Sequence, residues 1–82
     1  MEIIKLYAEW CGPCKVMEET LVNLGIEHKS IDIDSEEGEE YVSEFKIRSI
    51  PALLKFENGE FIDKLIGSQS TDKIKEFCYG NN

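Results

Sequence analysis

The most reactive residues in this sequence are two cysteines separated by two residues, Cys11-Gly12-Pro13-Cys14. A β-rich, nearly continuous apolar segment precedes them, and apolar residues at helical spacing follow them. Both sulfurs are therefore expected in the opening turn of a helix, where unpaired amides and the helix dipole favour an anion. We expect Cys11, at the mouth of the turn, to be the nucleophile. Cys14 lies one turn further in, is close enough to close a small disulfide, and should react second.

Two other uses of the cysteine pair are less well supported. A structural zinc site needs four ligands, and beyond the pair the sequence offers only His28 and Cys78 at an unsuitable spacing. A pair of inert buried cysteines does not explain Gly-Pro between two sulfurs at a helix start. Three cysteines is also an odd count for a disulfide scaffold. The pattern favours a dithiol that exchanges disulfides.

The elements that position the cysteines follow from the apolar periodicity. In order, the predicted elements are strand 3–8, helix 13–24, strand 28–33, helix 36–45, strands 52–56 and 61–66, and a last helix after Gly67, capped by Ser70 or Thr71, that ends at Gly80. A helix separates the first two strands, so they should lie parallel through a right-handed crossover. Asn58-Gly59 between two apolar runs predicts a hairpin.

Length and charge limit the class of protein. Eighty-two residues with 41% hydrophobic content predict a single domain over residues 1–82. A formal charge of −8 lacks the attraction to phosphates on which nucleic-acid binding depends. The apolar runs are far shorter than the roughly 20 residues of a membrane helix. The N-terminus has no signal-peptide pattern, so we expect a cytoplasmic protein that binds neither nucleic acid nor membrane.

Two segments of the sequence resemble the thioredoxin family. Residues 7–15 (YAEWCGPCK) are similar to the family's active-site segment, and residues 47–56 with Asn58-Gly59 resemble the segment around its cis-proline and hairpin. The likeness continues from Gly67 to Phe77 and so covers nearly the whole chain. The extra strand and helix that open a full-length thioredoxin are absent, which leaves the size of a glutaredoxin.

The resemblance implies an α/β, thioredoxin-like fold with the order β-α-β-α-β-β-α. Its four-stranded mixed sheet would have the order 2-1-3-4, with the first and last helices on one face and the middle helix on the other. It also implies a cis peptide bond between Ile50 and Pro51 facing the cysteines, which leaves the preceding carbonyl and amide free to pair with an extended peptide. The implied substrate-binding rim around the disulfide consists of Trp10, Gly12, Pro13, Ile50, Pro51 and Gly67.

The function implied by the resemblance is that of a monomeric protein-disulfide reductase. It would cycle between the Cys11/Cys14 dithiol and disulfide with no bound cofactor and no metal. Electrons would come from NADPH through a thioredoxin reductase, and the targets would be disulfide-containing proteins such as ribonucleotide reductase or peroxiredoxins. Glutathione or a ferredoxin-linked reductase are alternative donors.

Two rival functions remain open at the level of sequence. The short length suggests a glutaredoxin-like, glutathione-dependent reductase, although Ser49-Ile50 before the proline and a single Gly67 differ from the usual glutaredoxin residues. The other rival is a binding subunit in which the fold serves a larger enzyme and the cysteines are dispensable. Replacing both cysteines by serine separates a reductase from a binding role.

Position 5 departs from the family pattern. Thioredoxins carry a buried acid six positions before the first cysteine, and here that residue is Lys5. Strand alternation places Lys5 on the same side as Ile3 and Tyr7, and the resemblance implies that this side faces the interior behind Cys14. A buried Lys5 is a possible proton acceptor for Cys14 as a neutral amine, or a stabiliser of the thiolate as an ammonium. If the ammonium instead reaches water, solvent or Glu9 takes the proton.

The remaining polar and sulfur-containing residues predict no second site. Cys78, on the apolar face of the last helix, is expected to be a small core residue. His28, at the head of a strand next to Lys29, is expected to be solvated. The acidic run at residues 36–40 suits the positive end of a helix dipole and a solvated face.

Overall fold

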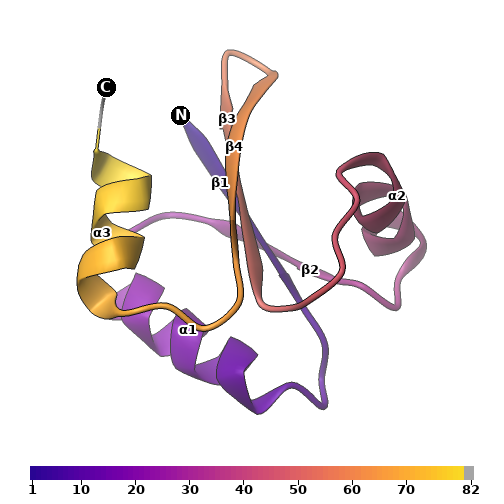
Figure 1. Cartoon of the computed structure of the whole chain (residues 1–82), viewed down its shortest axis with the longest axis horizontal. Coiled ribbons are helices and arrows are strands. Elements are labelled where there is room, and N and C mark those ends of the chain that lie inside the picture. Colours follow the sequence, from indigo (N-terminus) through magenta and orange to yellow (C-terminus); the bar gives the residue numbers. More distant parts are fainter. Residues whose placement is uncertain (81–82) are drawn as a thin grey trace.

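Seven elements follow one another in the predicted order β-α-β-α-β-β-α (Figure 1). The structure is a computed structural model that describes residues 1–80. The elements are β1 (Glu2–Tyr7), α1 (Gly12–Asn23), β2 (Lys29–Asp32), α2 (Glu36–Glu44), β3 (Ala52–Glu57), β4 (Glu60–Ile66) and α3 (Thr71–Tyr79). The predicted boundaries are correct to within one or two residues, and β2 begins after His28.

The four strands form one mixed sheet in the predicted order β2-β1-β3-β4. Strand β1 pairs in parallel with β2 on one side and antiparallel with β3 on the other. It is therefore a central strand, and its residues 3–6 are all buried, as its continuous apolarity predicts. The parallel pair requires the crossover through α1, which places the start of that helix at the end of β1.

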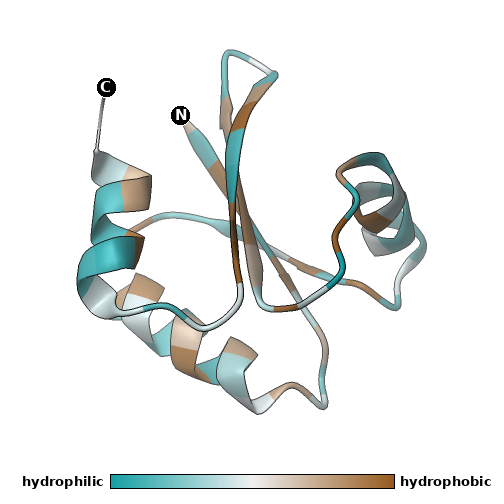
Figure 2. Ribbon diagram, viewed as in Figure 1, coloured by the Kyte–Doolittle hydropathy of each residue, from teal (hydrophilic) through white to brown (hydrophobic). Residues whose placement is uncertain are grey.

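Helices cover both faces of the sheet (Figure 1). Helices α1 and α3 pack on one face, where Leu21 and Ile74 join Ile3 and Leu53 in one buried cluster. Helix α2 packs on the other face, where Tyr41 and its neighbours cover a second cluster. Figure 2 shows hydrophobic colour on stretches of the strands and of each helix, alongside hydrophilic colour. The arrangement confirms the thioredoxin-like fold that the resemblance implies.

Side chains at the helix starts supply the caps that unpaired amides need. Cys11 caps α1, and its sulfur accepts a hydrogen bond from the amide of Cys14. Ser35 caps α2 and accepts from the Gly38 amide at 3.0 Å. Of the two predicted candidates for α3, Ser70 is the cap. The first helix is therefore capped by a cysteine sulfur, whereas the other two are capped by serine hydroxyls.

Two glycines are required by the backbone. Asn58 and Gly59 have φ of 52° and 82°, so both central residues of the hairpin turn are left-handed, as a two-residue turn of this kind demands. Gly38 lies where α2 crosses the end of β2. A Cβ on Gly38 would overlap the carbonyl oxygen of Asp32 and lie 2.7 Å from the Cα of Ile33. Gly38 therefore sets how closely α2 approaches the sheet.

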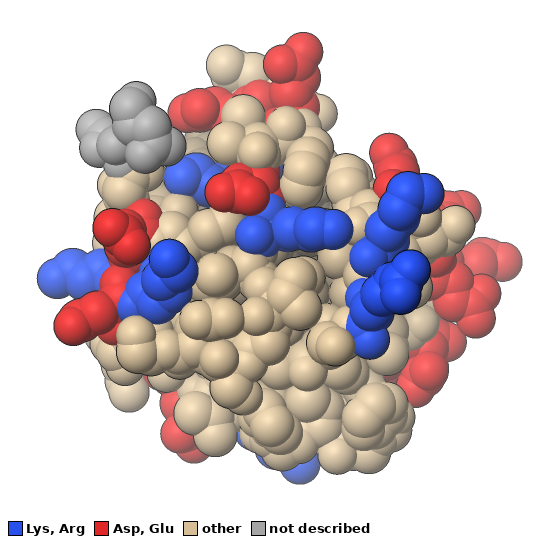
Figure 3. Space-filling view, viewed as in Figure 1, with Lys and Arg blue, Asp and Glu red and all other residues tan. Residues whose placement is uncertain are grey.

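The outer surface of α2 is acidic. Its first turn carries Glu36, Glu37 and Glu39, which suit the positive end of the helix dipole. Figure 3 shows acidic side chains gathered on the side of the molecule where α2 lies. Within residues 1–80, no helix has the length and apolarity needed to cross a membrane.

Candidate active site

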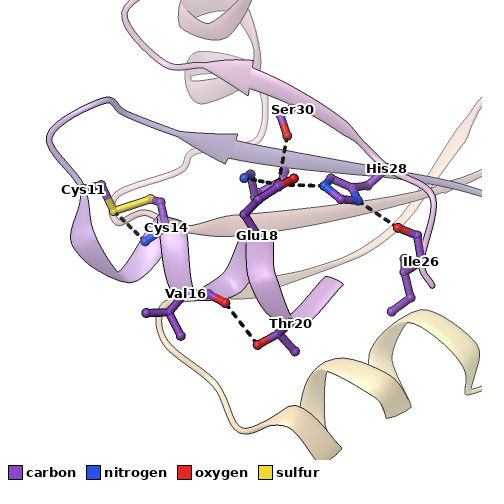
Figure 4. Close-up of polar contacts among 9 residues, drawn as sticks. Cys11, Cys14, Val16, Glu18, Thr20, Ile26, His28 and Ser30 are labelled. Carbon is purple, nitrogen blue, oxygen red and sulfur yellow. Dashed lines mark hydrogen bonds and ion pairs between the residues drawn. A yellow bond between two sulfur atoms is a disulfide. The ribbon is translucent and has the colours of Figure 1, made fainter. Parts of the chain in front are cut away.

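A disulfide between Cys11 and Cys14 closes the first turn of α1 (Figure 4). Their Cα atoms are 5.3 Å apart. The backbone amide of Cys14 donates a hydrogen bond to the Cys11 sulfur, with an N···S distance of 3.1 Å. This amide and the helix dipole both point positive charge at Cys11, so they would stabilise its thiolate once the disulfide is reduced.

Both cysteines are enclosed in the oxidised protein. Cys11 is 4% exposed and Cys14 is 2% exposed, so burial barely separates them. They pack with Ala8, and the side chains of Tyr7, Ile33 and Ile50 border this small cluster. The difference between the two sulfurs therefore lies in their positions on the helix, with Cys11 at the cap and Cys14 three residues further in.

The expected rim residues lie on three segments, residues 10–13, residues 50–51 and Gly67. Trp10, directly before Cys11, is 71% exposed, and Gly12 and Pro13 are exposed as well. Ile50 packs against the cysteine cluster. The Ile50–Pro51 bond is cis, and the amide of Gly67 donates to the carbonyl oxygen of Pro51 at 2.8 Å. Ile50 thus brings a segment distant in sequence against the cysteines, and the hydrogen bond links Gly67 to that segment.

A hollow of about 340 Å³ opens beside this rim. It is lined by Trp10, Ile33, Val42, Ile47, Arg48, Ser49 and Ile50. Sequence reasoning did not identify Ile33, Val42 or Arg48 as site residues. Arg48 lies close to Pro51 in the sequence, which is a signal that was available. Ile33 and Val42 come from the end of β2 and from α2, and no local pattern links them to the cysteines.

Lys5 is buried, as one of the two sequence alternatives requires. It is 4% exposed, and its ammonium donates to Oε1 of Glu18 on α1 at 2.5 Å. The ammonium also lies over the Tyr7 ring, 5.1 Å from the ring centroid. Sequence reasoning missed Glu18. Its spacing of four residues from Cys14, one turn along the same helix face, was the available signal.

The expectation that His28 is solvated was wrong. Its side chain is only 8% exposed, because Nε2 lies 2.8 Å from Oε1 of Glu18 and Nδ1 lies 2.9 Å from the carbonyl oxygen of Ile26 (Figure 4). Hydrogen bonds from Lys5 and then from His28 lower the pKa of Glu18 from 4.5 to about 2. Glu18 is therefore ionised at neutral pH.

Cys78 is a core residue, as expected. It is 1% exposed on the face of α3 that packs against α1 and the sheet. Burial raises the pKa of its thiol, and the charge of Lys55 offsets part of this rise. Across residues 1–80, no group of three or more histidine, cysteine or acidic side chains gathers in a way that could hold a metal ion.

Comparisons with known proteins agree with this geometry. The family profile described as Thioredoxin matches residues 1–79. A thioredoxin from Mycoplasmoides gallisepticum is 34% identical over 77 residues, which are 90% of this chain and 77% of that protein. A mutant thioredoxin from Halobacterium salinarum superposes with a TM-score of 0.79 at 30% identity, over 93% of this chain and 69% of that one. The oxidised mitochondrial thioredoxin 3 of Saccharomyces cerevisiae superposes with a TM-score of 0.78 at 27% identity. The match covers 93% of this chain and 74% of that one. This chain belongs to the thioredoxin family of thiol–disulfide oxidoreductases.

Proposed function

We propose that this protein reduces disulfides in other proteins, with Cys11 as the nucleophile and Cys14 as the resolving thiol. The observation that carries the assignment is the Cys14 amide directed at the Cys11 sulfur at the start of α1. The Cys11 thiolate attacks one substrate sulfur, forms a mixed disulfide and releases the other sulfur as a thiolate. Cys14 then loses its proton and attacks Cys11, which releases the reduced substrate and closes the Cys11–Cys14 disulfide.

The apolar rim supports docking of an extended substrate segment. Trp10 exposes a large indole next to an enclosed disulfide, and exposed aromatic groups of this kind are typical of binding surfaces. Ile50 borders the cysteines, and Pro51 and Gly67 are joined by a hydrogen bond. Gly12 and Pro13 add little bulk at the helix start. A substrate strand lying across this rim would bring its disulfide to Cys11.

The finer biological assignment is part of the same proposal. The oxidised protein would be recharged by NADPH through a thioredoxin reductase. Its targets would be disulfide-containing proteins of the ribonucleotide reductase or peroxiredoxin kind. A dithiol reductant works in a reducing compartment, so we place it in the cytoplasm. The formal charge of −8 favours protein partners over nucleic acid, and the protein would act as a monomer and a single domain over residues 1–82.

The test is a reduction assay on a protein disulfide with three donors in parallel. These are NADPH with thioredoxin reductase, glutathione, and a ferredoxin-linked reductase. We expect turnover with the first donor, and loss of turnover in Cys11→Ser and in the double variant Cys11→Ser/Cys14→Ser. Turnover with glutathione alone would favour the glutaredoxin-like reaction instead. Absence of turnover with every donor would contradict the reductase assignment and leave a binding role.

A further inference from the structure

A cluster of charges lies behind Cys14, and in it Lys5 occupies the place of the family's buried acid. Lys5 is 4% exposed on the face of β1 that packs against α1. An isolated ammonium is costly at such a position, and burial favours its neutral form unless an anion pairs with it. The carboxylate of Glu18 supplies that anion at 2.5 Å. The buried side chain of Lys5 is therefore paired with a carboxylate.

Glu18 accepts more than one hydrogen bond. Its Oε1 also lies 2.8 Å from Nε2 of His28 and 3.4 Å from the hydroxyl of Ser30. On the other side of the imidazole ring, Nδ1 faces the carbonyl oxygen of Ile26 at 2.9 Å. A carbonyl oxygen and a carboxylate both accept hydrogen bonds, so they hold the His28 ring from two sides. The Lys5 ammonium and the His28 ring thus share one carboxylate.

This cluster borders the resolving cysteine. Cys14 and Glu18 are four residues apart on α1, so their side chains lie on one face of the helix. Lys5, Cys14 and Glu18 line the same cavity of about 240 Å³. The cavity is completed by Tyr7, Ala8, Glu9 and Lys15. Glu9 and Lys15 are exposed and opposite in charge, whereas Lys5 is buried. Lys5 is therefore the cavity's buried charge, in the low dielectric where charges act most strongly.

We propose that Lys5 remains an ammonium throughout the reaction and stabilises the Cys14 thiolate that resolves the mixed disulfide, while Glu18 and His28 are positioning residues that hold the ammonium in place. The proposal rests on the reductase function above. The Cys14 proton goes to water. The Cys14 thiolate then forms the bond to Cys11, and the bond from Cys11 to the substrate sulfur breaks, with its electron pair leaving on that sulfur. The family places a proton acceptor behind this cysteine, whereas this chain places a fixed positive charge there.

The kinetic test follows one turnover with a chromogenic reagent. Reduced protein reacts with one equivalent of the aromatic disulfide dithiobis(nitrobenzoate), which releases one coloured thiolate when Cys11 attacks and a second when Cys14 resolves. In Lys5→Met the first release should be unchanged. Loss of the ammonium should raise the pKa of Cys14, so the thiolate becomes scarcer but also more nucleophilic. If the pKa of Cys14 rises by about one unit, the second release should be about threefold slower at pH values below the midpoint of Cys14 ionisation. Above that midpoint it should be equally fast or faster.

Kinetics alone cannot distinguish an ammonium beside a thiolate from a neutral amine beside a thiol, because both states hold the same number of protons. NMR of the wild-type protein separates them. In the reduced protein, the Cβ resonance of Cys14 should titrate between about pH 6 and about pH 9 while the Cε resonance of Lys5 stays at its ammonium position. A Lys5 resonance that moves to the neutral-amine position over that range would overturn the proposal and make Lys5 a base. This measurement needs no variant and stands even if Lys5→Met does not fold.

Glu18→Gln tests the positioning role, and Glu19→Gln is the matched control. Both replace one glutamate of α1 by its amide, but Glu19 is exposed. In Glu18→Gln the buried ammonium loses the anion that holds it in place, so the pH profile of the second thiolate release should change in the same direction as in Lys5→Met. Glu19→Gln should leave this profile unchanged. Identical profiles in the wild type and both variants would contradict the role of Glu18.

The outcomes separate this proposal from the reductase assignment. If the first thiolate is released but the pH profile of the second is identical in wild type and Lys5→Met, the reductase function stands and the role of Lys5 is structural. If neither thiolate is released from the reduced wild-type protein, the reductase assignment itself fails. Circular dichroism of each variant verifies that the fold is retained.

Discussion

The backbone amide of Cys14 donates a hydrogen bond to the sulfur of Cys11, at 3.1 Å. This contact makes the two cysteines chemically unequal although both are enclosed to a similar extent. An amide donor and the start of a helix favour negative charge on Cys11. Cys14 lies three residues further along the helix, and it lines a cavity together with the buried Lys5 and with Glu18. The surroundings of the two sulfurs therefore come from different parts of the structure.

The first prediction separates the two thiols. Cys14→Ser should accumulate a covalent adduct with a protein disulfide substrate, because Cys11 still attacks and nothing resolves the product. Cys11→Ser should form no such adduct. Mass spectrometry of each variant after mixing with substrate identifies the modified residue. An adduct on Cys14 in the Cys11→Ser variant, formed at the wild-type rate, would reverse the assigned roles.

The second prediction concerns docking. Trp10→Ala removes the exposed indole beside the disulfide and should raise KM for a protein substrate about tenfold, equivalent to roughly 1.4 kcal/mol of binding. The matched control is Val22→Ala, because Val22 is 60% exposed near the end of α1, the helix whose start follows Trp10. It should leave KM unchanged. Steady-state reduction assays measure both variants, and an equal KM for wild type and Trp10→Ala would exclude docking at this residue.

The third prediction tests the close approach of α2 to the sheet. In Gly38→Ala the added methyl group overlaps the carbonyl oxygen of Asp32, so α2 must shift. We expect a loss of about 1 to 3 kcal/mol in the free energy of unfolding, measured by urea denaturation. Gly12→Ala is the control, since a Cβ there meets no atom within 4 Å. A Gly38→Ala variant as stable as Gly12→Ala would contradict this packing.

The fourth prediction is that the free energy of unfolding depends on pH because of the ionisation of Glu18. Its pKa in the folded protein, about 2, lies below its ordinary value of 4.5. A lowered folded-state pKa contributes stability above about pH 4.5, and this contribution is lost as the pH falls toward 2. Glu18 is 42% exposed, so solvent screening limits the effect to about 1 kcal/mol at pH 7. Urea denaturation should show that Glu18→Gln is less stable than wild type at pH 7 and that the gap closes near pH 2. A gap that persists at that pH would point to another cause.

The fifth prediction concerns the third cysteine. Cys78 is buried in the core and burial raises the pKa of its thiol. In the reduced native protein, iodoacetamide should therefore modify Cys11 quickly and leave Cys78 unmodified, because the thiolate is the reactive form. Denaturation should make Cys78 as reactive as an ordinary cysteine. Peptide mapping by mass spectrometry would show rapid native labelling of Cys78 if the thiol were accessible for regulation.

Much of the fold was predictable because its determinants are local. The apolar continuity of residues 3–6 indicated a central strand, and Asn58-Gly59 indicated the hairpin, since a left-handed turn needs residues of this type. Cys11 and Cys14 were recognisable as a redox pair because three residues of helix bring their sulfurs together. Ser70 and Thr71 were adjacent candidates for the N-cap of α3, and only the backbone geometry shows that Ser70 is the cap.

The charged cluster behind Cys14 was decided by the tertiary structure. From the sequence, the Lys5 ammonium could reach water or lie buried. The outcome depended on whether the interior contained a carboxylate to pair with it. Glu18 lies thirteen residues from Lys5 and ten from His28, and the packing of α1 on β1 and β2 brings the three side chains together. The dithiol and the order of elements were predictable, because both follow from periodicity and spacing along the chain. Only the packed structure decided the partners of the buried charge, because ion pairing depends on distances of a few ångströms between segments that no local pattern connects.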